Sequence, residues 1–133
     1  MPVLDSDIII AFFRNIPKAV KIIDNLIEEE SYLQTTIFNV AELYKGAFLS
    51  SKVNENLKQI EDFLQNINIL DFTLADVLIY AQISSELRKK GEKIGIFDEL
   101  IASIAINNDE TLITRNIAHY KRISQLSLKD WDT

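Results

Sequence analysis

The chain has 133 residues, of which 47% are hydrophobic and 26% are charged, a balance that suits one globular domain with its own core. It contains no cysteine, which excludes disulfides, thiolate metal sites and cysteine nucleophiles and agrees with a reducing cytosol. The net charge of −6 disfavours broad electrostatic attraction to nucleic acid, but it does not exclude a nuclease whose carboxylates hold metal ions that contact the phosphate.

The N-terminal part of the chain alternates between short apolar segments and a helical pattern. Residues 2–4 predict a short buried strand. The apolar run at residues 8–13 is far shorter than the ~20 residues of a membrane-spanning helix and lacks the basic flank of a secretory leader, so we expect a cytoplasmic protein. Pro17 suits the first turn of a helix, and the apolar residues between 19 and 27 recur at helical spacing. Residues 32–35 predict a second strand.

The middle of the chain predicts two more helices and a strand. One apolar stripe indicates a helix over residues 37–48, and a second indicates a helix over residues 57–67 that runs into a strand around residues 69–70. The first stripe consists of Ile37, Val40, Ala41, Tyr44 and Phe48, and the second of Leu57, Ile60, Leu64 and Ile67.

The clearest helix signal begins at Thr73. Thr73 and Asp76 have the spacing of a capping box, in which the hydroxyl and the carboxylate accept hydrogen bonds from free backbone N–H groups. The basic run at residues 88–90 suits the negative C-terminal end of this helix, and Gly91 suits its cap. The face that we expect to be buried consists of Val77, Tyr80, Ala81, Ser84 and Leu87.

The remaining residues predict a helix over residues 97–107, a strand over residues 111–114 and an edge strand over residues 126–128. This alternation of strands and helices predicts an α/β fold, with a mostly parallel twisted sheet covered by helices on both faces. Ligands of such sheets gather at the carboxyl ends of the strands. We expect one domain over residues 1–133.

Acidic and amide side chains occur where strands are predicted to end and where the following helices begin. In a doubly wound sheet these positions can reach one edge of the sheet. Carboxylates without histidine or cysteine select a hard cation such as Mg²⁺ or Mn²⁺, which can activate water and stabilise an in-line phosphoryl displacement. The residues at these positions are Asp5, Asp7, Glu42, Asp98 and Asn116.

Each acidic residue also has a purely structural explanation. Asp5 or Asp7 could cap the first helix, and Asp98 could be a helix N-terminal charge favoured by the dipole. Glu42 could be an ordinary surface residue of its helix, but its neighbours suit packing, and a charge in such a segment needs a partner or a metal. The residues alone leave both explanations open.

Five segments resemble, in order, the motifs of PIN domains in VapC toxins of VapBC toxin–antitoxin pairs. Residues 4–7 (LDSD) resemble the opening LDT[ND], and residues 40–47 (VAELYKGA) resemble VAELYxGA. Residues 95–102 (GIFDELIA) resemble GxxDxLIA. Residues 114–120 (TRNIAHY) resemble the TRNxxHF ending, and residues 128–131 (LKDW) the closing LxxW. The match covers nearly the whole chain.

The resemblance implies a PIN-like three-layer α/β/α sandwich that cleaves single-stranded RNA with Mg²⁺ or Mn²⁺. It assigns Asp5, Glu42 and Asp98 as catalytic metal ligands. Asn116 occupies the catalytic position where many PIN domains have a fourth aspartate, so the resemblance leaves open whether one or two metals bind. It further implies an RNA substrate, a cognate antitoxin and a homodimer.

Five neighbouring residues receive supporting roles from the same resemblance. Ser6 replaces the more common threonine and is expected to orient a carboxylate, with Asp7 and Thr114 as further supporting residues. Arg115 and His119 are candidates for RNA contact. His119, the only histidine, could instead act as a general base or pack on the surface.

Several aromatic residues exceed what one helix face needs. Most are expected in the core, and some are expected to line a groove between the early helices where an antitoxin segment binds. The set consists of Phe12, Phe13, Phe38, Tyr44, Phe48 and Phe63.

Two other functions stay open at this point. One is a non-catalytic or RNA-processing PIN scaffold that binds RNA, because Asn116 leaves the fourth acidic position empty. The other is an acid-cluster phosphohydrolase, because residues 5–7 after an apolar strand resemble the DxD of haloacid dehalogenases. The later lysine and the paired acid of that family are not identifiable in the chain.

Overall fold

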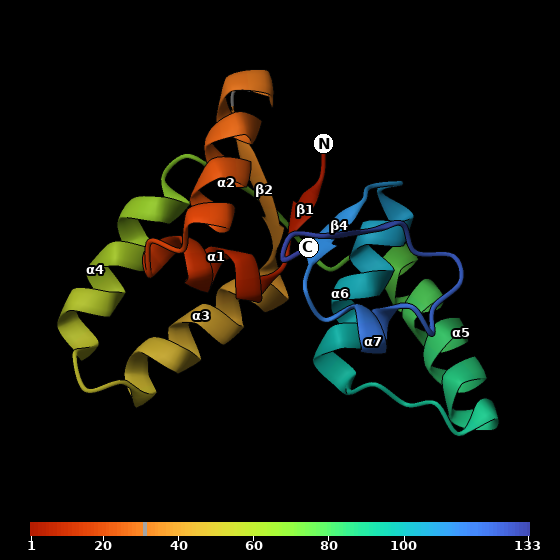
Figure 1. The fold of residues 1–133 in the computed structure, drawn as a ribbon. Helices are drawn as coiled ribbons and strands as arrows, with labels where there is room; N and C mark the ends of the chain where they lie inside the picture. Colours follow the sequence, from red (N-terminus) through yellow and green to blue (C-terminus); the bar gives the residue numbers. More distant parts are fainter. Residues whose placement is uncertain (31) are drawn as a thin grey trace.

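The computed structural model describes residues 1–30 and 32–133, in which helices and strands alternate as expected for an α/β protein (Figure 1). No helix of this part of the chain is long and apolar enough to cross a lipid bilayer. The strands are β1 (Val3–Leu4), β2 (Leu33–Thr36), β3 (Ile67–Leu70), β4 (Leu112–Thr114) and β5 (Leu128–Asp130). The helices are α1 (Ser6–Phe13), α2 (Pro17–Glu30), α3 (Ile37–Leu49), α4 (Val53–Leu64), α5 (Leu74–Lys90), α6 (Ile96–Asn107) and α7 (Ile117–Tyr120).

Every strand pairing is parallel. Backbone hydrogen bonds join the strands in the orders β1-β4-β5 and β2-β3. Side chains connect the two groups, because the Thr35 hydroxyl donates to the Leu4 carbonyl at 2.7 Å and Gln34 Nε2 donates to the Met1 carbonyl at 3.0 Å. β2 therefore lies beside β1, and the carboxyl ends of all the paired strands point to the same edge.

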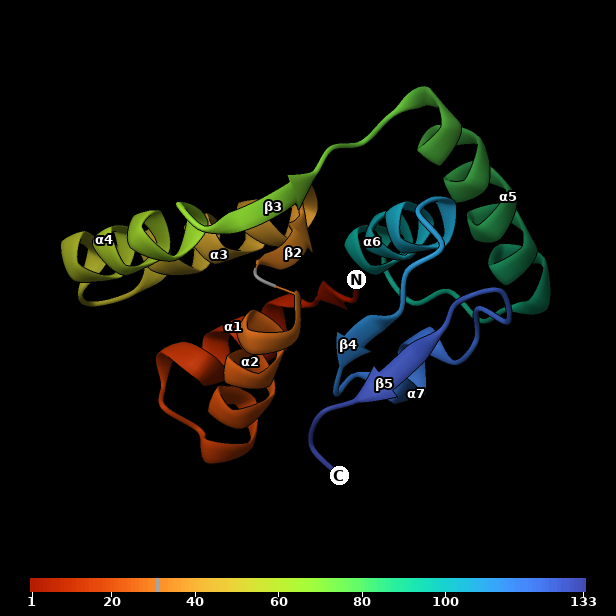
Figure 2. The ribbon, with the colours of Figure 1, turned by 90° about the horizontal axis from the view of Figure 1, so that it is seen from above.

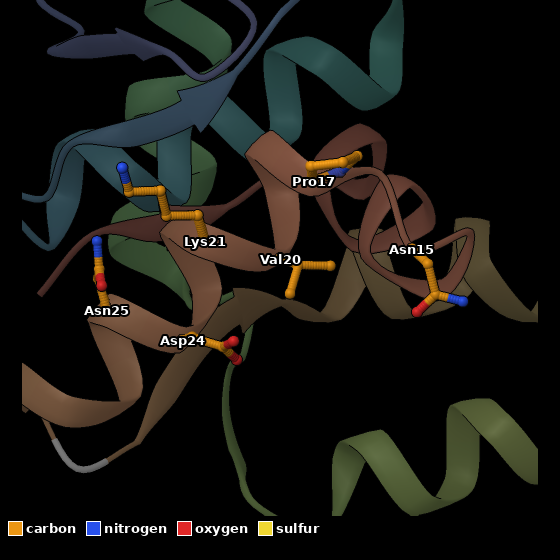
Figure 3. Close-up of a pocket in the computed structure, with 6 residues that line it drawn as sticks. All are labelled: Asn15, Pro17, Val20, Lys21, Asp24 and Asn25. Carbon is orange, nitrogen blue, oxygen red and sulfur yellow. The ribbon is translucent and has the colours of Figure 1, made fainter.

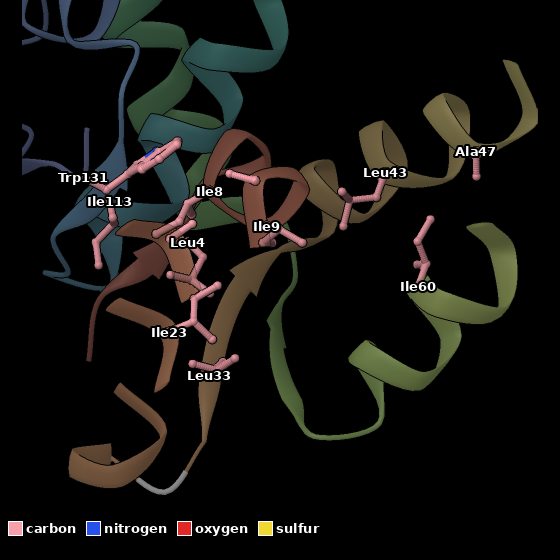
Figure 4. Close-up of a cluster of buried hydrophobic side chains, with 12 residues drawn as sticks. Leu4, Ile8, Ile9, Ile23, Leu33, Leu43, Ala47, Ile60, Ile113 and Trp131 are labelled. Atoms are coloured by element: carbon pink, nitrogen blue, oxygen red, sulfur yellow. The ribbon is translucent and has the colours of Figure 1, made fainter. Parts of the chain in front are cut away.

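Helices cover both faces of the central strands, which confirms the three-layer α/β/α arrangement. Figures 1 and 2 show α1 and α2 on one side of β1 and α5 and α6 on the other. Because successive strand residues point to opposite faces, Leu4 and Ile113 enter the core formed with α1 to α4, which Figure 4 shows. Their neighbours Val3 and Leu112 enter the second core, formed with α5 and α6.

The capping signals of α5 are confirmed. Thr73 is the N-cap, its hydroxyl accepts from the backbone N–H of Asp76, and the Asp76 carboxylate accepts from the backbone N–H of Thr73. Gly91 closes the helix with a φ of 70°, a left-handed conformation that favours glycine.

The predicted element boundaries are wrong by more than one residue in three places, the first being the start of α4 at Val53 rather than at residue 57. Ile67 belongs to β3 rather than to the preceding helix, which ends at Leu64. The last strand occupies residues 128–130 rather than 126–128, and Leu126 packs into the second core before the strand begins. Short apolar runs in a sequence do not distinguish helix from strand. Here the position of each strand is determined by its parallel neighbour, because β3 pairs with β2 and β5 pairs with β4.

The buried faces of α3 and α5 also differ from the predicted stripes. In α3, Ile37, Ala41 and Phe48 are exposed, whereas Asn39 is fully buried. The Asn39 amide hydrogen-bonds to Asp5 and Ser6 inside the protein, so its side of the helix faces inward. In α5 the buried residues are Asp76, Ile83 and Leu87, and the predicted core residues Val77 and Ala81 are exposed.

The sequence predicts no bounds for two of the helices, although Asp5 and Asp7 are candidate caps of a first helix. α1 arises from the apolar run at residues 8–13, which shows no helical period because it is apolar on every side. α7 is a single turn after β4, too short to produce a periodic pattern. Both matter for the site, because they adjoin the carboxyl ends of β1 and β4.

Candidate active site

An open depression of about 550 Å³ lies where β1 and β4 end, with further walls from α3 and α6. It brings together the predicted catalytic residues Asp5, Glu42, Asp98 and Asn116, which are widely separated in the sequence. Thr114 and His119 do not line it but hydrogen-bond to residues that do. The lining residues are Asp5, Ser6, Asp7, Ile10, Glu42, Asp98, Arg115 and Asn116.

Asp5 is the most deeply buried acid of the depression, with 6% of its surface exposed. Its Oδ1 accepts hydrogen bonds from the backbone N–H of Ser6 and from Asn39 Nδ2, both at 2.9 Å. Its Oδ2 accepts from the Thr114 hydroxyl at 2.8 Å. Asp5 is also the N-cap of α1, so the structural explanation considered above is confirmed for this residue. A carboxylate has about four acceptor positions, so these three donors do not exhaust its capacity to bind a cation.

Ser6 connects Asp5 to Glu42. The Ser6 hydroxyl donates to Glu42 Oε1 at 2.9 Å and accepts from Asn39 Nδ2 at 2.9 Å. Asn39 is itself held by a capping box with Thr36 at the start of α3. This chain of contacts gives Glu42 a defined orientation and fits the orienting role predicted for Ser6.

Asp7 is bound by three donors from the C-terminal part of the chain. Its Oδ2 accepts from the backbone N–H of Arg115 at 3.0 Å and lies 3.0 Å from the Thr114 hydroxyl, whose single proton it shares with Asp5 Oδ2. Its Oδ1 accepts from the Trp131 indole N–H at 2.9 Å. Asp7 therefore ties the start of α1 to β4 and to the residues after β5, which suits a supporting residue.

Asp98 receives its hydrogen bonds from α7 and the residue before it. The Tyr120 hydroxyl donates to Oδ1 at 3.2 Å, and Asn116 Nδ2 donates to Oδ2 at 3.4 Å. His119 Nδ1 lies 3.7 Å from the same Oδ2 and 3.2 Å from Asn116 Nδ2. The residue that replaces a fourth aspartate thus contributes an amide donor to Asp98 instead of a further negative charge.

Three residues of this network were not predicted from the sequence: Asn39, Tyr120 and Trp131. Asn39 could have been noticed as a polar residue inside the apolar segment that opens α3, where a buried amide needs partners. The motif that residues 114–120 resemble ends in phenylalanine, whereas this chain has Tyr120 there. The added hydroxyl is the signal that could have pointed to a hydrogen bond. Trp131 belongs to the closing LxxW motif, but that motif does not reveal its contact with Asp7, which joins opposite ends of the chain.

Asp5, Glu42 and Asp98 are destabilised in their charged form. Burial and the adjacent Asp7 raise the pKa of Asp5 to about 7. Burial also raises the pKa of Glu42 and of Asp98. The pKa of Tyr120 is raised by burial and by the nearby acids, so its hydroxyl stays a proton donor. Clustered, desolvated acids of this kind mark candidate functional sites.

The donor set fits a hard divalent cation, although it is not a preformed cage. Among the residues that the structure describes, no three His, Asp or Glu side chains converge closely enough to hold one ion. Mg²⁺ commonly binds through one or two carboxylates and completes its octahedron with water and substrate oxygens. The depression contains carboxylates with raised pKa values and is lined by a single cationic side chain. It therefore supplies the one or two carboxylate ligands that Mg²⁺ needs.

A different hollow lies along α2, and Figure 3 shows its lining residues on the surface of that helix. Its charged groups are Lys21 and Asp24, one of each sign, and it contains none of the predicted site residues. Nothing in its chemistry suggests catalysis, so the acidic depression is the candidate active site.

A groove between α1, α3 and α4 opens into the acidic depression. Ile10 and Glu42 line both the groove and the depression. The groove has a volume of about 310 Å³, and its apolar lining includes Phe13, Leu43 and Ile60. Of the predicted aromatic set, Phe12, Phe13, Tyr44 and Phe63 pack against the first core, Phe38 packs against the second, and Phe48 is 64% exposed.

The PIN domain family model matches residues 3–125, nearly the same span as the motifs. The chain belongs to the PIN domain family. This PIN domain is 32% identical to Ribonuclease VapC1 of Haemophilus influenzae strain R2866 over 128 residues, 96% of each chain. It is 31% identical to the tRNA(fMet)-specific endonuclease VapC of Shigella flexneri, again over 96% of each chain.

Solved structures agree with this family assignment. The PIN domain superimposes on a chain of the VapBC2 structure from Rickettsia felis, solved with a promoter DNA fragment, with a TM-score of 0.89 and 32% identity over 98% of each chain. It superimposes on a chain of VapBC-1 from nontypeable Haemophilus influenzae with a TM-score of 0.87 at the same identity and coverage. The resemblance to VapC-type PIN domains is therefore confirmed.

Proposed function

We propose that this PIN domain is a Mg²⁺- or Mn²⁺-dependent endoribonuclease and the toxin component of a VapBC pair. The observation that supports this most directly is that Asp5, just after β1, Glu42 of α3 and Asp98 of α6 line one depression. Relatives covering 96% of the chain are named as ribonucleases, which supports RNA as the substrate. The family assignment gives no support to the haloacid dehalogenase alternative.

In this proposal Asp5, Glu42 and Asp98 supply the carboxylate ligands, with one or two of them bound directly to the cation and the rest acting through its water molecules. When bound, the ion would lower the pKa of a water molecule and offset negative charge on the scissile phosphate. Thr114 and Ser6 keep the carboxylates of Asp5 and Glu42 in fixed orientations by donating hydrogen bonds at 2.8 and 2.9 Å. Such outer contacts commonly affect metal affinity by 10- to 100-fold.

Asn116 and Tyr120 orient Asp98 without adding charge. With an amide in the fourth position, we expect weaker attraction for a second cation than an aspartate would provide. His119 lies at the edge of this group, and we propose contact with RNA for it.

The carboxylate assignment is tested by three substitutions. Asp5→Ala, Glu42→Ala and Asp98→Ala should each lower RNA cleavage by at least ~100-fold, because each removes oxygen ligands that no neighbour supplies. Glu28→Ala, which removes an exposed acid of α2, serves as the matched control. Cleavage of single-stranded RNA and of tRNA(fMet) would be followed with Mg²⁺ and with chelator, and circular dichroism would show that each variant is folded.

An endoribonuclease and a non-catalytic PIN scaffold predict different results in this cleavage assay. A non-catalytic PIN scaffold would bind RNA and leave it intact in Mg²⁺. If all three alanine variants cleaved RNA at the wild-type rate, the acidic depression would not be the active site.

We further propose that an antitoxin segment occupies the groove between α1, α3 and α4. The groove is apolar and reaches the active site at Ile10 and Glu42, so a segment bound there would obstruct access to the carboxylates. The neighbouring structures are titled as VapBC, which supports a protein partner.

We propose a homodimer that forms through another apolar face. The N-terminal halves of α5 and α6 expose several large hydrophobic side chains, and exposed apolar surface of this kind suits an interface. The group consists of Leu74, Val77, Leu78, Ile96 and Phe97.

A further inference from the structure

Trp131, the only tryptophan of the chain, lies just after β5 and contacts two residues of the depression. Its edge donates the indole N–H to Asp7 Oδ1 at 2.9 Å. Its face supports the Arg115 guanidinium, whose Cζ is 5.5 Å from the ring centroid. Only 3% of Trp131 is exposed, because the ring also packs into the first core, as Figure 4 shows. The core therefore holds the ring in place.

Arg115 is the single basic side chain among the described residues that line the depression. It is exposed and takes part in none of the ion pairs found in the described part of the chain. Its backbone N–H donates to Asp7 at 3.0 Å, so its Cα is fixed by the same carboxylate that holds the indole. Stacking on the ring face keeps the guanidinium in place while its N–H groups stay available to a ligand.

The ligand that suits this arrangement is a phosphodiester. A chain with a net charge of −6 and a depression lined by four carboxylates repels an RNA backbone. A planar guanidinium matches two phosphate oxygens with paired N–H donors, which an ammonium group cannot do. A fixed arginine at the edge of the acidic depression thus provides local attraction where the overall charge provides none.

We propose that Trp131 is a positioning residue that presents Arg115 to a phosphate of RNA lying across the depression, with Asp7 fixing the edge of the ring and the backbone of Arg115. This inference rests on the proposed function. It makes the segment after β5 part of the RNA-binding site, although that segment does not itself line the depression.

Binding would be measured by fluorescence anisotropy with a fluorescein-labelled single-stranded RNA of mixed sequence. Ca²⁺ replaces Mg²⁺, and a denaturing gel shows that the RNA stays intact. We expect Arg115→Ala to weaken binding about tenfold and to reduce the slope of log K against log salt by about 0.7, the value for one phosphate contact on a single strand. Arg115→Lys should keep the slope and lose part of the affinity. Lys129→Ala, at an exposed lysine of β5, is the charge-matched control and should match the wild type.

The role of Trp131 is separated from a general structural role by a double-mutant cycle. Trp131→Leu should weaken RNA binding nearly as much as Arg115→Ala, and the double variant should bind no worse than Arg115→Ala alone. Trp131→Phe keeps an aromatic face and should stay within about threefold of the wild type. Circular dichroism at the assay temperature confirms folding, and Trp131→Phe tests the proposal even if Trp131→Leu does not fold.

Tryptophan fluorescence gives an independent measurement, because Trp131 is the only tryptophan. Unlabelled RNA should change the emission of the wild type at the concentrations that saturate anisotropy, because the guanidinium on the ring face engages phosphate. The same RNA should leave the emission of Arg115→Ala nearly constant at RNA concentrations that saturate that variant.

The possible outcomes are distinguishable. If the wild type binds and cleaves RNA but Arg115→Ala behaves like Lys129→Ala, the inference is wrong and the proposed function stands. The inference is also wrong if Trp131→Leu adds its full loss to that of Arg115→Ala, because Trp131 would then act independently. A wild type that neither binds nor cleaves RNA overturns both.

Discussion

At the scale of single residues, Asp5 combines two properties that the sequence presented as alternatives. It caps α1 through its hydrogen bond to the Ser6 backbone N–H, and it lies in the acidic depression with Glu42 and Asp98. The same burial that makes it an effective cap makes its charge costly. A carboxylate in this position is poorly solvated without a cation and well suited to bind one.

The stability of the metal-free protein should therefore depend on the ionisation of Asp5. Its folded pKa of about 7 lies above the unfolded value of 3.8, so its contribution to the free energy of unfolding is complete at low pH and is lost as pH rises towards 7. In chelator, the difference in unfolding free energy between wild type and Asp5→Asn should change in favour of the variant by about 2 kcal/mol between pH 5 and pH 7.

Denaturant unfolding at several pH values measures this difference in unfolding free energy. The amide of the variant also changes the hydrogen bonds, but this effect does not vary with pH and so does not alter how the difference depends on pH. Mg²⁺ at pH 8 should stabilise the wild type more than the variant, because binding to the folded state offsets the cost of the charge. A pH-independent difference would mean that the Asp5 charge is already balanced inside the protein.

Tyr120 is the residue whose hydroxyl distinguishes this chain from the motif it resembles. Tyr120→Phe keeps the buried ring and removes the hydrogen bond to Asp98 Oδ1. We expect about a tenfold loss of Mn²⁺ affinity, because Asp98 loses one of the donors that orient it. Titration followed by Mn²⁺ electron paramagnetic resonance measures this, and Tyr32→Phe, at a residue 47% exposed, is the control. Equal affinities in all three proteins would remove Tyr120 from the metal site.

At the scale of secondary structure, capping boxes mark where α3 and α5 begin, and their polar residues lie on buried faces. In α3, Asn39 also hydrogen-bonds to Asp5 and Ser6, Leu43 and Ala47 are buried, and Glu42 lines the depression. In α5 the Asp76 side chain of the capping box is buried, whereas Val77 is exposed. A polar residue can therefore define a buried helix face more strongly than the apolar stripe beside it.

Removing one cap tests this explanation. Thr73→Ala should lower the free energy of unfolding by about 1 kcal/mol, because the backbone N–H of Asp76 loses its acceptor and the Asp76 carboxylate loses a hydroxyl donor. Ser85→Ala, at an exposed serine within the same helix, should change stability by less than about 0.5 kcal/mol. Thermal and urea unfolding of both variants measures the difference, and equal stabilities would show that the box does not hold the helix end.

At the scale of the whole molecule, the groove between α1, α3 and α4 adjoins the candidate active site at Ile10 and Glu42. Gly46 lines this groove within α3, and a Cβ added there meets no atom within 4 Å. Gly46 therefore has room for a Cβ, and we expect a larger side chain at this position to occupy part of the groove.

Gly46→Leu should prevent neutralisation by the cognate antitoxin while leaving RNA cleavage intact. Gly46→Ala is the matched control: it should still be neutralised, and it should be more stable by about 0.5–1 kcal/mol, because glycine is unfavourable inside a helix. Growth of cells that express each variant with and without the antitoxin measures neutralisation. Full rescue of Gly46→Leu would place the antitoxin elsewhere.

The sequence by itself determined the fold class, the order of most elements and the residue types of the site. Helical spacing, the caps at Thr73 and Gly91 and the motif residues Asp5, Glu42 and Asp98 are local signals that need no knowledge of partners. Only the tertiary structure decided which face of α3 and α5 is buried, where β3 and β5 begin, and which donors hold each acid. These depend on contacts between residues distant in the chain, such as Trp131 with Asp7 and Tyr120 with Asp98. Periodicity within one element cannot encode such contacts, because they form only when the carboxyl ends of β1 and β4 lie side by side.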